Sequence, residues 1–377
     1  EIGVYESLAT LESNSWTIGN QLVSGFYPNR IPNPDLKWEK TGQFDIGFDL
    51  GLFNNRLRLT ADYYYKKTTD LLYNVAIPSA SGYDSMLKNI GSVQNKGYEL
   101  SIESDNLSGA FSWTTAFNIS FNRNKVLELG GETYKDVGTY DDHLKTSDIR
   151  RLIVGQPIGV FYGYRFDGIF QNEAECAQQT SSPSPIGVGL RRYKDLNGDG
   201  KIDATNDREI LGDANPKFFG GMTNTFAYRG FELNVFLQYS YGNKIFNYNA
   251  MELESPTGGQ NVYQDLVNRW TPTNPSNEYQ KATTNRNNIV SDRFIEDGSF
   301  LKLKTVSLSY SFPKLNWKHI GGLRLYVTGQ NLLTWTKYRG YDPEVSYRGA
   351  STLEAGEDFG GYPQARTFMF GIKLDIK

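Results

Sequence analysis

The chain has 377 residues, and its 39 Lys and Arg against 42 Asp and Glu leave a net charge of −3. This balance gives no electrostatic basis for binding nucleic acid, which favours a strongly basic surface. No stretch approaches the roughly 20 apolar residues of a transmembrane helix. A single cysteine, Cys176, excludes a disulfide framework, and 14% aromatic residues argue against disorder. The β-barrel remains as a membrane class, because its strands are only half apolar.

Apolar and polar residues alternate along much of the chain, and this period of two predicts strands. In the first example, Phe44, Ile46 and Phe48 alternate with polar residues or glycine, and Asn54-Asn55 then suits a tight turn. Soluble strands average about 5 to 6 residues, whereas transmembrane strands need about 9 to 11. The segments predicted to span a membrane are 36–53, 56–74, 91–106, 109–124, 217–228, 231–246, 298–312, 323–335 and 368–377.

The connections between these strands alternate in length. Short turns are expected at 54–55, 107–109, 229–230 and 313–322, and long polar loops at 75–91, 129–215, 247–297 and 337–363. Transmembrane barrels have short periplasmic turns and long extracellular loops, so we expect the long loops outside the cell. If the alternating segment 156–171 crossed the membrane as one additional strand, the long loops would no longer all lie on the same side. It is predicted to be an extracellular hairpin or an upward strand extension.

Nine strands do not close a bacterial single-chain barrel, which has an even number, and an open edge in lipid is costly. The fold class predicted is therefore all-β, a partial antiparallel transmembrane barrel with the missing strands before Glu1, on the same polypeptide or a cleaved partner. A large soluble β-sandwich is the alternative, disfavoured by strand length and uneven connections. The polar half of the alternation is expected to line the lumen, with Arg58, Asp62, Glu99, Asn118 and Gln238 as examples.

Several motifs resemble those of a known family. Residues 31–40 (IPNPDLKWEK) resemble the start of a barrel strand in TonB-dependent receptors. Further matches, to the SusC/RagA family of TonB-linked transporters from Bacteroidetes, are 52–57 (LFNNRL), 62–72 (DYYYKKTTDLL), 89–97 (NIGSVQNKG), 195–203 (DLNGDGKID) and 341–346 (YDPEVS). The likeness covers essentially residues 1–377, but only the C-terminal part of the family's architecture.

The resemblance implies an integral barrel of 22 strands in the cell outer membrane, contacting lipid. It further implies an N-terminal plug that this chain lacks, energy supplied through TonB, and a SusD-like lipoprotein as a lid. Such complexes import oligosaccharides or peptides. Two other functions remain open: a β-rich surface protein for binding or adhesion without transport, and a passive porin. A plug domain upstream would favour transport over both.

The loop 129–215 contains a calcium-type motif. Asp195, Asn197 and Asp199 occupy positions 1, 3 and 5, with Gly200 at the sharp turn. An EF-hand has Glu at position 12, where this chain has Asn206, so weak affinity suited to extracellular calcium is expected. A solvated turn rich in Asp and Asn is the alternative. The predicted Ca²⁺ ligands are Asp195, Asn197, Asp199, the Lys201 carbonyl and Asp203 or Asp207.

Catalytic chemistry has little support in the sequence, so no enzyme is predicted. His143 and His319 are far apart, and Cys176 has no evident base beside it. Ligand recognition is instead expected from aromatic residues in or near the long loops, whose faces would stack on sugar rings. Membrane girdle, loop packing and lid interface are the alternatives. The candidates are Trp16, Trp270, Trp335, Tyr338 and Tyr341.

Overall fold

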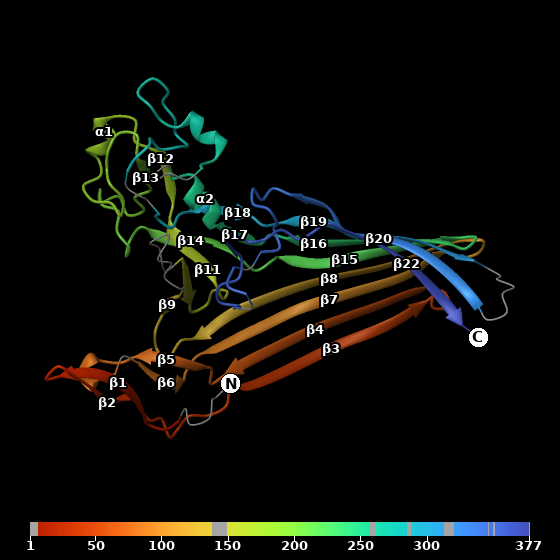
Figure 1. Cartoon of the computed structure of the whole chain (residues 1–377), viewed down its shortest axis with the longest axis horizontal. Coiled ribbons are helices and arrows are strands. Elements are labelled where there is room, and N and C mark those ends of the chain that lie inside the picture. The colour runs from red at the N-terminus through yellow and green to blue at the C-terminus, as the bar shows by residue number, and fades with distance from the viewer. Residues whose placement is uncertain are drawn as a thin grey trace.

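The computed structural model describes residues 7–83, 85–137, 149–255, 261–284, 288–312, 320–345, 347–349 and 351–376. Its largest element is an antiparallel sheet of nine strands in the order β22-β20-β19-β16-β15-β8-β7-β4-β3, the long curved wall of Figure 1. All nine predicted spanning strands are present, which confirms that prediction. They are β3 (Lys40–Leu52), β4 (Leu57–Thr69), β7 (Ser92–Leu107), β8 (Phe111–Glu128), β15 (Phe218–Tyr228), β16 (Phe231–Tyr241), β19 (Phe300–Phe312), β20 (Ile320–Thr336) and β22 (Thr367–Ile376).

Positive backbone angles set several strand ends. The segment 56–74 was predicted too long, because Asp70 has φ +57° directly after β4. The segment 231–246 was also too long, because Gly242 has φ +89° directly after β16. At the other end of the wall, Arg229 and Gly230 have φ +46° and +89°, the geometry of a tight two-residue hairpin turn. Of the predicted turn 313–322, residues 313–319 lie outside the described part of the chain.

The two faces of the wall have opposite chemistry. On the apolar face Leu59 lies opposite Ile102, whereas on the polar face Arg58 lies opposite Glu103. The apolar face is exposed in this chain, to the extent of 83% for Phe370. Strand register confirms that the predicted lumenal residues share the polar face: Arg58, Asp62, Glu99, Asn118 and Gln238.

Strands β3 and β22 form the two edges of this sheet, and each pairs with a wall strand on one side only within the described residues. The wall is therefore open, and the prediction of a partial barrel is confirmed. No helix within the described ranges is long and apolar enough to cross a membrane.

The long connections leave one end of the wall, and the tight turns lie at the other (Figure 1). We call the described residues of 129–217, 242–299 and 337–366 the loop layer. They form three small sheets, ordered β14-β11-β10-β9, β12-β13 and β18-β17-β21. Their strands are β9 (Tyr134–Val137), β10 (Arg150–Ile153), β11 (Val160–Tyr164), β12 (Phe166–Ile169), β13 (Arg191–Tyr193), β14 (Arg208–Asp213), β17 (Lys244–Asn247), β18 (Ile295–Asp297) and β21 (Glu357–Asp358).

The segment 156–171 lies in these small sheets and not in the wall, so the prediction that it does not span alone is confirmed. Within it, β11 pairs with β10 and β14, and β12 pairs with β13. Two hairpins outside the loop layer pair β1 (Thr10–Ile18) with β2 (Gln21–Arg30) and β5 (Leu72–Ala76) with β6 (Ser85–Asn89). The helices are α1 (Glu173–Cys176), α2 (Tyr248–Leu253), η1 (Ser79–Ser81), η2 (Gln264–Asn268) and η3 (Asp292–Phe294).

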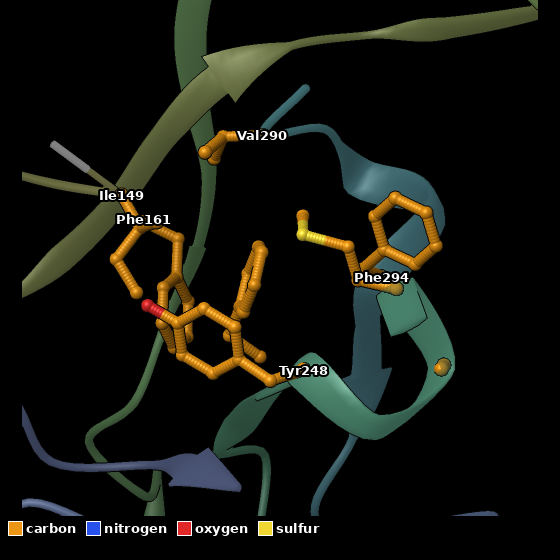
Figure 2. Packing of buried hydrophobic residues seen from close by; sticks show 8 residues of the cluster. Ile149, Phe161, Tyr248, Val290 and Phe294 are labelled. Carbon is orange, nitrogen blue, oxygen red and sulfur yellow. The ribbon is translucent and has the colours of Figure 1, made fainter. Parts of the chain in front are cut away.

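The main hydrophobic core lies in the loop layer (Figure 2). Phe246 is fully buried, and its ring centroid is 6.1 Å from that of Phe161 and 6.5 Å from that of Phe294. These three rings come from the connection after β8 and from both ends of the connection between β16 and β19. The loop layer is therefore one packed unit. Its core consists of Ile149, Phe161, Phe246, Tyr248, Ala250, Met251, Val290 and Phe294.

Candidate functional site

A cluster of charges joins the polar face of the wall to the loop layer. Lys302 of β19 is only 1% exposed, and its ammonium group lies 2.6 Å from Asp342 and also donates to Glu344. A β-bulge between Leu303 and Thr305 disrupts the alternation, and the intervening Lys304 also reaches Glu344, at 2.9 Å. We call Lys302, Lys304, Gln238, Asp342 and Glu344 the wall–loop cluster. Gln238 donates to Glu344 at 2.9 Å.

The lysines keep the carboxylates of this cluster ionised. Burial opposes ionisation of Asp342, but hydrogen bonds, with that from Lys302 the strongest, outweigh it and lower its pKa. The pKa of Glu344 is lowered in the same way, by Lys302 and Lys304 against burial. The connection 337–366 is thus held against the polar face by charges shielded from water, where removing one partner is expensive.

Further ion pairs join the parts of the loop layer to one another. Arg150 and Glu357 are both almost fully buried, with Nε 2.9 Å from the carboxylate, and Arg150 also donates to the Gly159 and Ala355 carbonyls. Burial lowers the pKa of Arg150 and raises the pKa of Glu357, against their mutual attraction.

A second group of ion pairs centres on buried Glu254. Its carboxylate lies 2.7 Å from Arg293 and 3.1 Å from Arg339, and Arg339 in turn lies 2.8 Å from Glu296. Arg339 comes from the connection after β20, whereas Glu254 and Glu296 come from the connection between β16 and β19. These ion pairs therefore join the two connections to each other.

Two cavities flank the β5–β6 hairpin, and both have Leu72 in their walls. The first, of about 490 Å³, is polar and suits hydroxyl, amide or charged groups. The second, of about 280 Å³, is mainly apolar and suits an aliphatic or aromatic group. The first is lined by Asn29, Arg30, Glu39, Leu72, Asn74, Ser85 and Leu87. The second is lined by Leu71, Leu72, Tyr73, Ile90, Gly91, Val93, Val126, Glu128, Leu129, Leu152, Ile158, Thr352 and Leu353.

The predicted calcium loop is held by its own backbone in this structure. Asp195 accepts from the amides of Gly198 at 2.6 Å and Gly200 at 2.7 Å. Buried Asp207 accepts from the amides of Leu196 and Asp203, which closes the loop. Within the described residues, no group of three or more His, Cys, Asp or Glu side chains is arranged to hold a metal. The oxygen types fit a hard cation, but they do not converge here, so calcium stays a prediction.

The remaining predicted ligands belong to the same loop. Asp199 accepts from the Lys201 amide at 2.8 Å, and Asn197 donates to Asp199 at 3.0 Å. Asp203 accepts from the amides of Asn206 and Thr205, and these bonds, that from Asn206 first, lower its pKa.

The structure does not bring the five predicted aromatic residues together. Trp16 lies on β1 and is 52% exposed, whereas Tyr341 is a 79% exposed residue of the loop layer. Trp270 is half-buried and donates to Gln171 at 3.0 Å. Tyr338 is buried, with its hydroxyl donating to Asp358, and Trp335 lies on the apolar face opposite Leu301. Their role in ligand binding stays a prediction.

Of the residues considered for catalysis, Cys176 lies within the described part of the chain. His143 and His319 lie outside the described residues. Cys176 is buried on α1, and burial, followed by Glu173 and Glu175, raises the pKa of its thiol. A raised thiol pKa disfavours the nucleophilic thiolate.

Sequence reasoning missed the charges that join the connections. Lys302 reads as an ordinary lumenal residue of an alternating strand, and nothing local predicts its burial. Asp342 and Glu344 were noted only as part of a family motif. Arg150 begins a strand of four residues, and its acidic partner lies 207 positions later, so the pair was not visible in the sequence. Long-range pairing of this kind is set by how the connections fold together.

Comparison with known proteins identifies the class of protein. Residues 7–172 match the family model described as TonB dependent receptor-like, beta-barrel. Together with the open wall of alternating strands, this confirms the predicted resemblance. The fold and location are those of a TonB-dependent receptor β-barrel in the outer membrane. The apolar face is therefore the membrane face, and the polar face is the lumenal face.

Individual relatives are similar along almost the entire chain. TonB-dependent receptor P3 of Formosa agariphila is 40% identical, with 99% of this chain and 38% of that protein covered. TonB-dependent receptor SusC of Bacteroides thetaiotaomicron is 29% identical, with coverage of 91% and 32%. The solved RagAB peptide transporter is 27% identical with a TM-score of 0.80, and 99% of this chain and 39% of that chain are covered. The chain thus spans about two fifths of the length of such relatives. They are receptors and transporters, which points away from an enzyme.

Proposed function

We propose that the protein containing this chain imports oligosaccharides or peptides across the outer membrane, as a transporter of the SusC type. A SusD-like lipoprotein would close over the ligand, and TonB would supply energy through a plug. The observation that carries the proposal is the wall–loop cluster. It secures a folded connection against the lumenal face at the end where the long loops gather.

The loop layer supports a selective importer better than an open pore. Buried ion pairs at Arg150 and Glu254 join separate connections, and a fixed arrangement of loops suits selective ligand binding. The cavities beside the β5–β6 hairpin offer one polar and one apolar surface, so both ligand classes are retained in the proposal. The ligand would be held among these loops before passage into the lumen.

Uptake in living cells tests the proposal. A strain lacking the gene for the full-length protein is complemented with that gene and given labelled oligosaccharides and peptides, in backgrounds with and without TonB. Uptake of at least one ligand class should require both the gene and TonB. Uptake that persists without TonB would indicate a passive porin, and binding without uptake would indicate an adhesion protein.

A matched pair of lysine variants connects uptake to the cluster. Lys302→Met leaves Asp342 and Glu344 without their buried cation, so the connection 337–366 should leave the lumenal face and uptake should fall. Lys66→Met removes an exposed lysine of the same face and should leave uptake unchanged. Equal uptake by both variants would show that the wall–loop cluster has no role in transport.

The calcium site is proposed separately. The donor set of 195–207 suits Ca²⁺ in type, and binding would require Asp195 and Asp199 to exchange backbone amides for the ion. Bound calcium would stiffen this loop and leave the wall unchanged.

A further inference from the structure

A groove of about 540 Å³ lies where four wall strands meet the loop layer. Phe218 lies opposite Tyr241, and Leu301 lies opposite both Tyr239 and Trp335. Because residues opposite each other in a sheet share a face, all five belong to the membrane face. The groove is thus on the outside of the barrel, at the level where its strands end.

Aromatic side chains that line the groove are exposed on the membrane face. Tyr241 is 51% exposed and Trp335 is 51% exposed, while the ring of Phe218 stacks on Tyr241 with centroids 5.0 Å apart. On this face the covering medium is the lipid of the outer membrane. Trp and Tyr are the side chains that favour the boundary between acyl chains and headgroups.

One end of the groove is polar. Asp297, Ser299, Thr336 and Lys337 contribute to it. Asp297 already accepts hydrogen bonds from the amide and hydroxyl of Ser299, at 3.1 and 2.6 Å. Burial opposes ionisation of Asp297, but these bonds outweigh it, with Lys244 and Lys337 contributing, and lower its pKa. The Asp297 carboxylate is therefore ionised, and it is hydrogen-bonded to Ser299.

Lys337 is the cationic residue of this lining, and its side chain is exposed. Lysine stems extend along apolar surface while the ammonium groups remain in water.

We propose that this groove binds a single outer-leaflet lipid that has a phosphate-bearing headgroup. The phosphate would lie near Lys337, and an acyl chain would lie along Leu301, Tyr241 and Trp335. The proposal rests on the membrane location and this geometry, so it is independent of what the protein transports.

Lipid retention by the purified full-length protein tests the proposal. The protein is extracted from outer membranes, washed in detergent and examined by native mass spectrometry for bound phosphate-bearing lipid. The wild type should retain one such lipid. Lys337→Gln should weaken retention about fivefold, the effect of one lysine near an anionic lipid surface. Trp335→Ala should weaken it by a similar factor, and Lys337→Arg should restore it.

A matched control separates a site from the general aromatic belt. Phe231→Ala removes an exposed ring from the same face at the other end of β16 and should leave retention unchanged. Heat-dependent gel mobility reports that each variant is folded. No lipid retained by the wild type would overturn the proposal. Equal loss in Phe231→Ala and Trp335→Ala would also overturn it, because it would indicate annular lipid alone.

Discussion

The wall and the loop layer bury opposite kinds of side chain. In the loop layer, Phe246 and Phe294 are fully buried in the hydrophobic core. In the wall, Phe48 is 58% exposed and Phe370 83% exposed, and the charged pair of Arg58 and Glu103 lies on the inner side. The medium around each region thus decides whether its phenylalanines are buried or exposed. Water surrounds a folded loop layer, whereas lipid surrounds the membrane face.

Charged pairs show the same contrast. Arg58 and Glu103 on the lumenal face are both more than half exposed, and such pairs contribute about 0 to 1 kcal/mol. Arg150 and Glu357 in the loop layer are shut off from water, where removal of one partner costs about 3–5 kcal/mol. The number of ion pairs therefore says little about where stability resides.

The largest predicted effect is Arg150→Met, which leaves buried Glu357 unpaired. We expect the loop layer to lose about 3–5 kcal/mol. Amide hydrogen exchange in detergent should show faster exchange throughout the loop layer and unchanged exchange in β7 and β8. Arg58→Met, the matched exposed pair, should change stability by about 1 kcal/mol or less. Adding Glu357→Leu to Arg150→Met should recover much of the loss. If stability does not recover, the Arg150 guanidinium stabilises the loop layer mainly through its hydrogen bonds to the Gly159 and Ala355 carbonyls.

A charge on the membrane face should have the next largest effect. Val235 lies in the middle of β16 on that face, and Val235→Arg should destabilise the barrel by about 2–4 kcal/mol. Val267→Arg changes an apolar residue of the loop layer that is 70% exposed, and should stay within about 0.5 kcal/mol. Urea unfolding in lipid vesicles measures both. Similar losses would show that exposure, and not the surrounding medium, decides the effect.

Acid should release the wall–loop cluster. The folded pKa values of Asp342 and Glu344 are lowered, so their contribution is fully present above the ordinary values of about 3.9 and 4.3. It is lost as the pH falls through the lowered values. Protease cleavage within 337–366 should therefore be slow at pH 7 and faster below pH 4. Lys302→Met should be cleaved readily at both pH values. A wild type cleaved equally at both would contradict the assignment.

Calcium should give the smallest effect. Titration calorimetry of the full-length protein should detect binding in the range of about 10⁻⁴ to 10⁻³ M, expected of an extracellular site. Asp199→Ala should abolish it, whereas Asp167→Ala, an exposed acid of the same loop layer, should not. Unchanged calcium binding in Asp199→Ala would eliminate the site.

The wall was predictable because its signal is long and local. Segments such as 109–124 alternate over many residues, and the turn at Arg229-Gly230 has local chemistry. The loop layer was not, since β10 and β17 have only four residues each and their partners are distant in sequence. The motif 195–203 was visible as a pattern, but whether its oxygens converge depends on backbone geometry. Trp335 could be placed on its face only once strand register was known.

The parallel pairing of β17 with β21 has a consequence for the order of assembly. Phe246 in β17 lies opposite Glu357 in β21, and β21 follows β20 in the chain. The loop layer therefore stays incomplete until the chain has passed through β20. Contacts between residues so far apart form late in folding. We expect protease resistance of the loop layer to appear after insertion of the wall. Its closure would then indicate that β20 is in place.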